Sequence, residues 1–252
     1  MSLILDAVSY CYRGAPRLAL EGVSLELPLK SIAIVVGANG SGKSTLLGIS
    51  SGRLKPQQGT ASFGTSRLDT LPPSALAERI AALPQSERVA FDFSCLDFVL
   101  FARAHKRAVF ADPRPQDLDS ARSALAVMEV EYLADRPVTE ISGGEFQLVR
   151  LARCVAQESS LLVLDEPTAM LDPAHTLAVA QAVRRIAKSG RAILIATHDL
   201  GFAASVADQA FVLRSGKLIA SGLPTEALSL QSLQNAFGVP FTAREVASPL
   251  GL

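Results

Sequence analysis

This sequence lacks the features that mark membrane-spanning and secreted proteins. Its longest apolar runs are short, such as Ile32 to Val36 and Leu161 to Leu164, whereas a helix that crosses a bilayer needs about 18 or more apolar residues. The first residues, Met1 to Asp6, lack the basic start and the long apolar stretch of a signal peptide. We therefore expect a chain that stays in the cytosol and has no transmembrane segment.

An excess of one charge and a set of paired cysteines are also missing. Lys plus Arg number 24 and Asp plus Glu number 24, so nothing favours nucleic acid or an anionic lipid surface as the main partner. Cys11, Cys95 and Cys154 are far apart, which indicates reduced thiols. The chain does have 252 residues, of which 49% are apolar, enough for one large domain or for one domain with an inserted subdomain.

The order of apolar patterns predicts an α/β fold with a parallel sheet covered on both faces, because strands and helices alternate along the chain. Between about residues 91 and 156 strand-like runs vanish and helical periodicity predicts an α-helical insertion. Elsewhere, strands are expected at residues 24–27, 31–36, 80–83, 161–164, 192–196, 210–213 and 218–220, and helices at residues 43–50, 173–188 and 200–206.

A phosphate-binding loop is predicted between the strand that ends at residue 36 and the helix that begins at Lys43. Residues 37–44 fit the pattern G-x-x-x-x-G-K-[ST]. Its glycines let backbone N–H groups turn toward phosphate oxygens, and the helix N-terminus adds positive potential. Lys43 is then placed for the β- and γ-phosphates, and the hydroxyl of Ser44 for Mg²⁺. The expected nucleotide contacts are Gly37, Ala38, Asn39, Gly40, Ser41, Gly42, Lys43, Ser44 and Thr45.

A pair of acids, Asp165 and Glu166, follows the apolar strand at residues 161–164. In an open parallel sheet, ligands bind at the edge where such strands end. We expect Asp165 to hold Mg²⁺ through water and Glu166 to orient and polarise the attacking water, since phosphoryl transfer depends on positioning and charge neutralisation. An acid pair alone would more often be a solvated strand end, and the phosphate loop is what favours catalysis.

A third segment, residues 141–147, reads Ile-Ser-Gly-Gly-Glu-Phe-Gln ahead of a helical pattern. Ser142 and Glu145 have the spacing of a capping box, which by itself explains both residues. It does not explain Gly143 and Gly144, since each glycine weakens a helix by about 1 kcal/mol. Bare backbone suits close approach to an anion, so we expect the segment both to cap a helix and to bind nucleotide.

These motifs, in this order, resemble the nucleotide-binding subunit of an ATP-binding-cassette transporter. Ser142 to Glu145 resembles that family's signature, and it lies one short helix ahead of the strand that ends in Asp165 and Glu166. The resemblance runs from about Leu3 to Val239. It implies ATP and Mg²⁺ as cofactors, ATP hydrolysis as the activity, and a head-to-tail dimer in which the signature of one subunit completes the ATP site of the other.

The resemblance also implies a P-loop NTPase core of the RecA-like type, with a mainly parallel sheet, an N-terminal antiparallel β part and an α-helical insertion. Carried over to this chain as a single ATPase domain, it places the nucleotide-binding core at residues 1–86 and 157–222. The helical signature subdomain is expected at residues 87–156 and a C-terminal helical tail at residues 223–252.

Three further site residues follow from the resemblance. Tyr12 stands where the family stacks an aromatic ring on adenine, and Tyr10 is the local alternative. Gln85 follows a predicted strand, as the family's glutamine does, and is expected to contact Mg²⁺ and the attacking water and to sense the membrane partner. His198 resembles the switch histidine that contacts the γ-phosphate; an ordinary strand-end histidine is the alternative.

Several positions depart from the family pattern. Ala169 stands where serine is usual, Phe146 replaces a polar or basic residue beside the signature, and Ile141 replaces leucine. The groups assigned to phosphate and Mg²⁺ are intact, so these departures bear on the dimer interface and not on hydrolysis. His105 and His175 lack any motif context, and we expect both on the surface.

The sequence favours one subclass of the family. A single cassette without a membrane span implies separate permease subunits, as in importers. Residues 96–105, 135–140 and 233–239 are similar to importers of iron chelates, haem, vitamin B12 and related metal complexes. Such importers also use an extracytoplasmic substrate-binding protein, and their ATPase is held on the cytoplasmic side of the cell membrane by the permease.

Residues from about 86 to 105 are expected to form the groove for a cytoplasmic helix of the permease, with the core of the helical subdomain as the alternative use of their apolar side chains. Two other function classes stay open. One is a soluble cassette ATPase that acts without a permease in cofactor assembly or DNA maintenance. The other is a binding module with dead catalysis, against which the presence of Glu166 and His198 argues. The sequence does not name the cargo.

Overall fold

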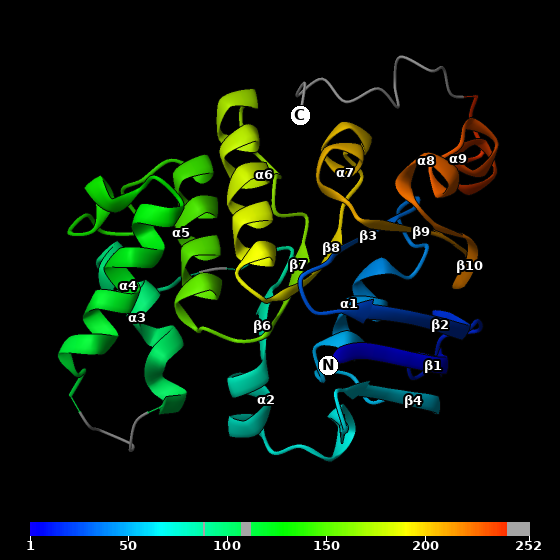
Figure 1. The fold of residues 1–252 in the computed structure, drawn as a ribbon, viewed down its shortest axis with the longest axis horizontal. Helices are drawn as coiled ribbons and strands as arrows, with labels where there is room; N and C mark the ends of the chain where they lie inside the picture. Colours follow the sequence, from blue (N-terminus) through cyan, green and yellow to red (C-terminus); the bar gives the residue numbers. More distant parts are fainter. Residues whose placement is uncertain (88, 107–111, 241–252) are drawn as a thin grey trace.

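The computed structural model describes residues 1–87, 89–106 and 112–240 and contains two β-sheets with helices around them (Figure 1). The larger sheet has the strand order β10-β9-β3-β8-β7-β6. Its pairs are parallel except for β9 with β10, so the predicted mainly parallel sheet is confirmed. Its strands are β3 (Ile32–Val36), β6 (Ile80–Leu83), β7 (Leu161–Asp165), β8 (Ala192–Ala196), β9 (Gln209–Arg214) and β10 (Lys217–Gly222).

The smaller sheet is antiparallel and comes from the N-terminal part of the chain, as predicted. Its strand order is β2-β1-β4-β5. The alternating burial of β2 shows that one face of this sheet packs inward while the other faces solvent. The strands are β1 (Ser2–Tyr10), β2 (Leu20–Pro28), β4 (Gln58–Phe63) and β5 (Ser66–Arg67).

Helix α1 (Lys43–Ser50) belongs to the apolar cluster that joins the two sheets. Leu46 and Leu47 lie in this cluster with Leu3 of β1 and Val163 of β7. Continuous apolar runs form β3, β7 and β8 because every residue of these strands is buried, which leaves no solvated face to alternate with.

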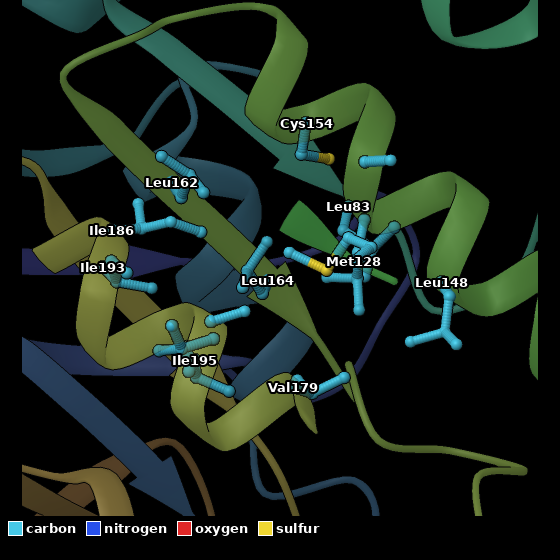
Figure 2. Close-up of a cluster of buried hydrophobic side chains, with 14 of the residues drawn as sticks. Leu83, Met128, Leu148, Cys154, Leu162, Leu164, Val179, Ile186, Ile193 and Ile195 are labelled. Atoms are coloured by element: carbon cyan, nitrogen blue, oxygen red, sulfur yellow. The ribbon is translucent and has the colours of Figure 1, made fainter. Parts of the chain in front are cut away.

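The opposite face of the larger sheet is covered by helices. Figure 2 shows Leu162, Leu164 and Ile193 of this face near Val179 and Ile186 of α6 (Pro173–Lys188). Helix α7 (Leu200–Val206) packs on the same cluster, and the short helices α8 (Pro224–Ala227) and α9 (Leu230–Phe237) follow β10. The core therefore lies on both faces of one mainly parallel sheet, and the loops that connect its strands and helices are left at its edges.

A helical region lies between β6 and β7 in sequence, as predicted, and stands to one side of the larger sheet (Figure 1). Its main helix, α5, packs on both α3 and α4, and Leu148 and Leu151 of α5 carry the same apolar cluster toward the sheet. Its elements are α3 (Cys95–Leu100), the 3₁₀ turn η2 (Phe101–Lys106), α4 (Pro115–Val127), the 3₁₀ turn η3 (Glu131–Leu133) and α5 (Gly143–Ala156).

Two short elements between β5 and β6 were not predicted from the sequence: the 3₁₀ turn η1 (Leu68–Thr70) and helix α2 (Pro73–Arg79). Helix α2 contains no buried residue, so it lacks the apolar stripe by which helical periodicity is recognised. Across residues 1–87, 89–106 and 112–240, no helix has the length and apolar content that crossing a bilayer requires. Cys11, Cys95 and Cys154 are free, as expected.

Candidate functional site

The phosphate loop joins β3 to α1 in a backbone path that requires glycine at its two ends. Gly37 has φ +158°, and a Cβ built on it would lie 2.2 Å from the carbonyl oxygen of Leu213. Gly42 has φ +111°, and its Cβ would lie 2.4 Å from the carbonyl oxygen of Ala19. Neighbouring backbone therefore leaves no room for a side chain, and the loop passes directly into the first turn of α1.

Lys43 is buried at the start of α1, and its side chain folds over the loop. Its Nζ donates hydrogen bonds to the carbonyl oxygens of Gly37 at 2.7 Å and Ala38 at 3.2 Å. Burial lowers the pKa of Lys43, while the charges of Glu166 and Asp165 act in the opposite direction. The Lys43 ammonium group is thus held among backbone carbonyls and interacts electrostatically with the carboxylates of Glu166 and Asp165.

Asp165 is the last residue of β7 and is buried beside the phosphate loop. Burial raises the pKa of this carboxyl group, and a hydrogen bond with the side chain of Ser44 opposes the shift. The charge of Glu166 raises the pKa further, and the charge of Lys43 lowers it. The structure therefore brings together the loop hydroxyl and the carboxylate that the sequence assigned to Mg²⁺.

Glu166 and His198 meet at the adjoining ends of β7 and β8. His198 Nδ1 lies 2.9 Å from Glu166 Oε2, and the hydroxyl of Thr197 donates to the same oxygen at 3.3 Å. Glu166 has φ +51°, a left-handed conformation that is uncommon for a residue with a side chain, and its N–H donates to the carbonyl oxygen of Ala196. His198 stays largely exposed, so it connects the buried carboxylate to the open side of the site.

A cleft of about 480 Å³ opens between the phosphate loop and these acids. Tyr12 lies at its rim and is 46% exposed, and the Tyr12 hydroxyl lies 3.2 Å from Thr45 Oγ1. The ring of Tyr10 meets that of Tyr12 edge-on at 5.0 Å but does not line the cleft. The lining residues are Tyr12, Ala19, Asn39, Gly40, Gly42, Lys43, Ser44, Thr45, Gln85, Asp165 and Glu166.

The cleft thus brings together most of the predicted site from distant parts of the chain. The predicted residues that do not line it are Gly37, Ala38, Ser41, His198 and the signature. Ala19 lines the cleft although the sequence analysis did not single it out. A lone alanine ahead of a strand carries no chemical pattern, so no sequence signal could have found it.

The signature forms the N-terminus of α5 and does not line this cleft. The predicted capping box is confirmed: Ser142 Oγ accepts from the N–H of Glu145 at 3.2 Å, and Glu145 Oε2 accepts from the N–H of Ser142 at 2.8 Å. Hydrogen bonds to the Glu145 carboxylate, first from the Ser142 backbone and then from the Ser142 side chain, lower the pKa of Glu145. A Cβ on Gly143 would meet only Met170 Sδ, at 3.7 Å, so packing within this chain does not require glycine there.

The positions that depart from the family pattern pack inside the chain. Phe146 lies against the apolar core, with its ring 5.6 Å from that of Phe98, and Ile141 packs on the same core. Ala169 donates its N–H to the carbonyl oxygen of Glu166 at 3.2 Å. Apolar side chains at positions 141 and 146 therefore contribute to the packing of the helical region.

The two histidines outside the motifs differ from each other. The side chain of His175 is 43% exposed at the surface, as expected, beside Asp172 at the start of α6. The expectation for His105 was wrong: its ring is half-buried, Nδ1 lies 2.9 Å from the carbonyl oxygen of Ala102, and Nε2 is buried. The 3₁₀ turn η2 folds the ring back onto its own backbone, and burial lowers the pKa of His105.

Comparison with known proteins agrees with this geometry. The family description "ABC transporter" matches residues 20–169. The hemin import ATP-binding protein HmuV of Pseudomonas aeruginosa is 38% identical over 232 residues, which cover 90% of this chain and 89% of that protein. The protein of the same name from Thermobifida fusca is 39% identical over 221 residues, covering 88% of this chain and 77% of its own length.

Among solved structures, a metal-chelate type ABC transporter in an inward-facing conformation superposes with a TM-score of 0.83 at 29% sequence identity, covering 95% of this chain and 90% of that chain. A component of the cbiONQ ABC transporter complex from Clostridium perfringens superposes with a TM-score of 0.79, also at 29% identity, and covers 91% of both chains. The length of the family match and the identity of 38–39% over most of both HmuV proteins show that this chain belongs to the ABC transporter family and is an ATPase.

Proposed function

We propose that this chain hydrolyses ATP to energise an importer of haem or a related iron chelate. The observation that carries the proposal is the near-complete alignment with hemin import ATP-binding proteins, in a chain whose phosphate loop, Asp165, Glu166 and His198 meet at one site. A metal-chelate type transporter is also among the structural relatives. The cleft supports hydrolysis, and the relatives support the class of cargo.

In the proposed reaction, the phosphate loop and Lys43 hold the β- and γ-phosphates at the N-terminus of α1. A water oxygen forms a bond to the γ-phosphorus while the bond between that phosphorus and the β–γ bridging oxygen breaks. The products are ADP and inorganic phosphate, and Glu166 accepts the proton that the water loses. His198, which lies 2.9 Å from the Glu166 carboxylate, orients this base and contacts the γ-phosphate.

The residues beside the loop fit Mg²⁺. This ion prefers oxygen ligands such as carboxylates and substrate phosphates, and the site offers the Ser44 hydroxyl, the Asp165 carboxylate and the side-chain oxygen of Gln85. Mg²⁺ bound there would neutralise charge on the β- and γ-phosphates. The raised pKa of Asp165 reflects burial, and a nearby cation would counter it.

We propose that Tyr12 stacks on adenine, because its exposed ring lies at the rim of the cleft and Tyr10 lies outside it. The signature, Ser142 to Glu145, belongs to the ATP site of a second copy in a head-to-tail dimer. Two observations support this: these residues do not line the cleft of their own chain, and a Cβ on Gly143 would meet only Met170 Sδ, at 3.7 Å, so packing within the chain does not require glycine there.

The permease would dock on the helical region, which we assign to residues 87–156. An apolar groove of about 280 Å³ lies there, lined by Glu87, Val89, Ala90, Phe91, Phe93, Phe98 and Phe101. Phe91 and Phe101 are exposed, whereas Phe98 is buried, so the expected groove and the alternative core share these side chains. With separate permease subunits and an extracytoplasmic binding protein, the chain would work on the cytoplasmic side of the cell membrane.

The catalytic assignment is tested with Glu166→Gln. We expect ATP affinity to be kept, kcat to fall by about 10²- to 10⁴-fold through loss of the base, and ATP to drive dimerisation, measured by phosphate release and size-exclusion chromatography. Glu140→Gln, at an exposed position outside the cleft, is the matched control. Full activity in Glu166→Gln would contradict the assignment of the base.

The importer assignment is tested by purifying the native complex. We expect an integral membrane permease to co-purify and haem-loaded binding protein to stimulate ATP hydrolysis by the reconstituted complex. Phe101→Asp in the groove is expected to abolish this stimulation and to spare basal hydrolysis. If the chain purifies alone and haem has no effect on ATP hydrolysis by any assembled complex, the importer assignment is wrong and the chain acts as a soluble cassette ATPase.

A further inference from the structure

Two polar side chains are buried on the inward face of α5, one turn apart. Gln147 is 6% exposed and Arg150 is 4% exposed, while their neighbours Leu148, Val149 and Leu151 are buried apolar residues. Arg150 donates from one guanidinium nitrogen to Gln147 Oε1 at 2.6 Å. Burying a guanidinium among apolar side chains is costly unless each of its donors is paired, so the partners of this pair are informative.

Gln147 holds the end of β7. Its side-chain nitrogen donates to the carbonyl oxygens of Glu166 at 3.2 Å and Pro167 at 3.0 Å. Glu166 is the residue with φ +51°, a backbone conformation that a residue with a side chain keeps only when its surroundings fix it. The two hydrogen bonds from Gln147 are therefore part of what aims the Glu166 carboxylate into the cleft.

Arg150 holds the segment around Gln85. A second guanidinium nitrogen donates to the carbonyl oxygen of Pro84 at 2.5 Å, and Nε donates to the carboxylate of Glu87 at 3.3 Å. These two residues flank Gln85, which lines the cleft, and Glu87 also lines the apolar groove. Arg150 thus holds this segment by hydrogen bonds both next to the nucleotide cleft and next to the apolar groove.

We propose that Gln147 and Arg150 act as a positioning clamp that fixes Glu166 and Gln85 relative to each other and ties both to the groove. This inference rests on the proposed roles of Glu166 and Gln85. A well-packed apolar pair at these positions would be at least as stable as a buried arginine network, so stability alone does not account for it. The clamp binds the carbonyl groups of Glu166, Pro167 and Pro84, which are Glu166 itself and immediate neighbours of Glu166 and Gln85.

The first test uses two variants of Gln147. Gln147→Glu keeps an acceptor for Arg150 but replaces the donor to Glu166 and Pro167, and Gln147→Met removes both functions at similar volume. We expect kcat for Mg-ATP hydrolysis to fall by about 10- to 100-fold, with KM and the affinity for a fluorescent ATP analogue changed by less than about two-fold. Retained nucleotide affinity shows that the variants fold, and the split between kcat and KM separates positioning from a structural role.

The second test compares two arginines on the same helix. Arg153 donates to both oxygens of Glu87 at 2.7 Å and stacks on Phe98, but it contacts neither Gln147 nor Pro84. We expect Arg150→Met to lower kcat by about 10-fold or more and Arg150→Lys to recover part of that loss. The matched control Arg153→Gln, which removes only the contacts to Glu87 and Phe98, is expected to leave kcat within about two-fold of wild type.

Three results overturn a proposal, and they are distinguishable. If Glu166→Gln is inactive while Gln147→Met and Arg150→Met keep wild-type kcat, the clamp is wrong and the proposed function stands. If Arg153→Gln lowers kcat as much as Arg150→Met, the effect belongs to the ion pair with Glu87 and the clamp is also wrong. If Glu166→Gln is fully active, the proposed catalytic role is wrong and the clamp loses its basis.

Discussion

The ATP cleft and the helical region differ in how the fold shifts the pKa values of their charged groups. In the cleft, burial lowers the pKa of Lys43 and raises the pKa of Asp165, so both shifts disfavour the charged form. For Asp117 in the helical region and Glu158 just after it, burial also acts to raise the pKa, yet hydrogen bonds and cations outweigh it and both pKa values are lowered.

The difference lies in the partners. Asp117 accepts from the Arg103 guanidinium at 3.1 Å and from Arg114, and Glu158 accepts from Arg103, Lys106 and Ser120. The charges of the cleft are less completely paired within the chain. Charged groups that serve only the fold are paired within the chain, whereas charged groups of a binding site pair with the ligand. Groups in a cleft whose pKa values are shifted are typical of the second case. The following variants test that distinction.

Lys43→Ala is expected to have the largest effect. Removing the cation that faces the β- and γ-phosphates is expected to lower kcat/KM for Mg-ATP by about 10²- to 10³-fold, measured by steady-state phosphate release. The exposed Lys55, which pairs with Asp69 outside the cleft, provides the control Lys55→Ala. Comparable losses of kcat/KM in the two variants would contradict the role of Lys43 in binding the phosphates.

Arg103→Met is expected to lower the free energy of unfolding by about 3 kcal/mol, because it leaves the buried carboxylate of Asp117 without its buried partner. The measurement is urea unfolding followed by circular dichroism. Arg114→Met removes an exposed partner of the same carboxylate and is expected to cost about 1 kcal/mol or less. An equal cost for both variants would mean that burial of the ion pair is not what stabilises the helical region.

Tyr12→Leu is expected to raise KM for ATP by about 5- to 10-fold, since stacking of a base on an aromatic ring contributes roughly 1–3 kcal/mol and leucine keeps part of the apolar contact. Because Tyr12 has no proposed role in the attack of water, kcat is expected to stay unchanged. Tyr10→Leu, in the neighbouring strand position outside the cleft, is the control. If Tyr10→Leu raises KM and Tyr12→Leu does not, the adenine contact has been assigned to the wrong tyrosine.

Glu158→Gln is expected to have the smallest effect, with a characteristic pH dependence. Although burial alone would raise the pKa of Glu158, hydrogen bonds from Lys106, Arg103 and Ser120 lower it from 4.5 to about 2. The ionised form therefore stabilises the fold fully above pH 4.5, and this contribution is lost as the pH falls toward 2. The side chain is 42% exposed, so solvent screening keeps the loss at pH 7 near 1 kcal/mol or below.

Urea midpoints of wild type and Glu158→Gln measured between pH 7 and pH 3 check this expectation. The difference between the two proteins is predicted to be constant from pH 7 to about pH 5 and then to shrink as the pH decreases. A difference that grows with acidity would mean that the carboxylate of Glu158 is not favourably paired in the folded state.

Much of the fold was predictable because local patterns of apolar and polar residues determine many of its helices and strands. Helices α1, α6 and α7 and strands β6 and β8 begin and end at the predicted residues. Where apolar periodicity is absent, prediction failed: α2 contains no buried residue and was missed. His105 was misplaced because the turn that folds its ring inward is set by η2, and a lone histidine carries no signal of its own burial.

The sequence by itself determined the phosphate loop, the acid pair and the capped signature, because each is a short segment whose spacing and residue types dictate a local conformation. Only the tertiary structure decided which of them meet. Glu166 and His198 touch because β7 and β8 are neighbours in the sheet, and the signature stays outside its own cleft because α5 belongs to the helical region. The clamp of Gln147 and Arg150 is likewise a product of packing, since its partners lie up to 66 residues away in the chain and no local pattern records them.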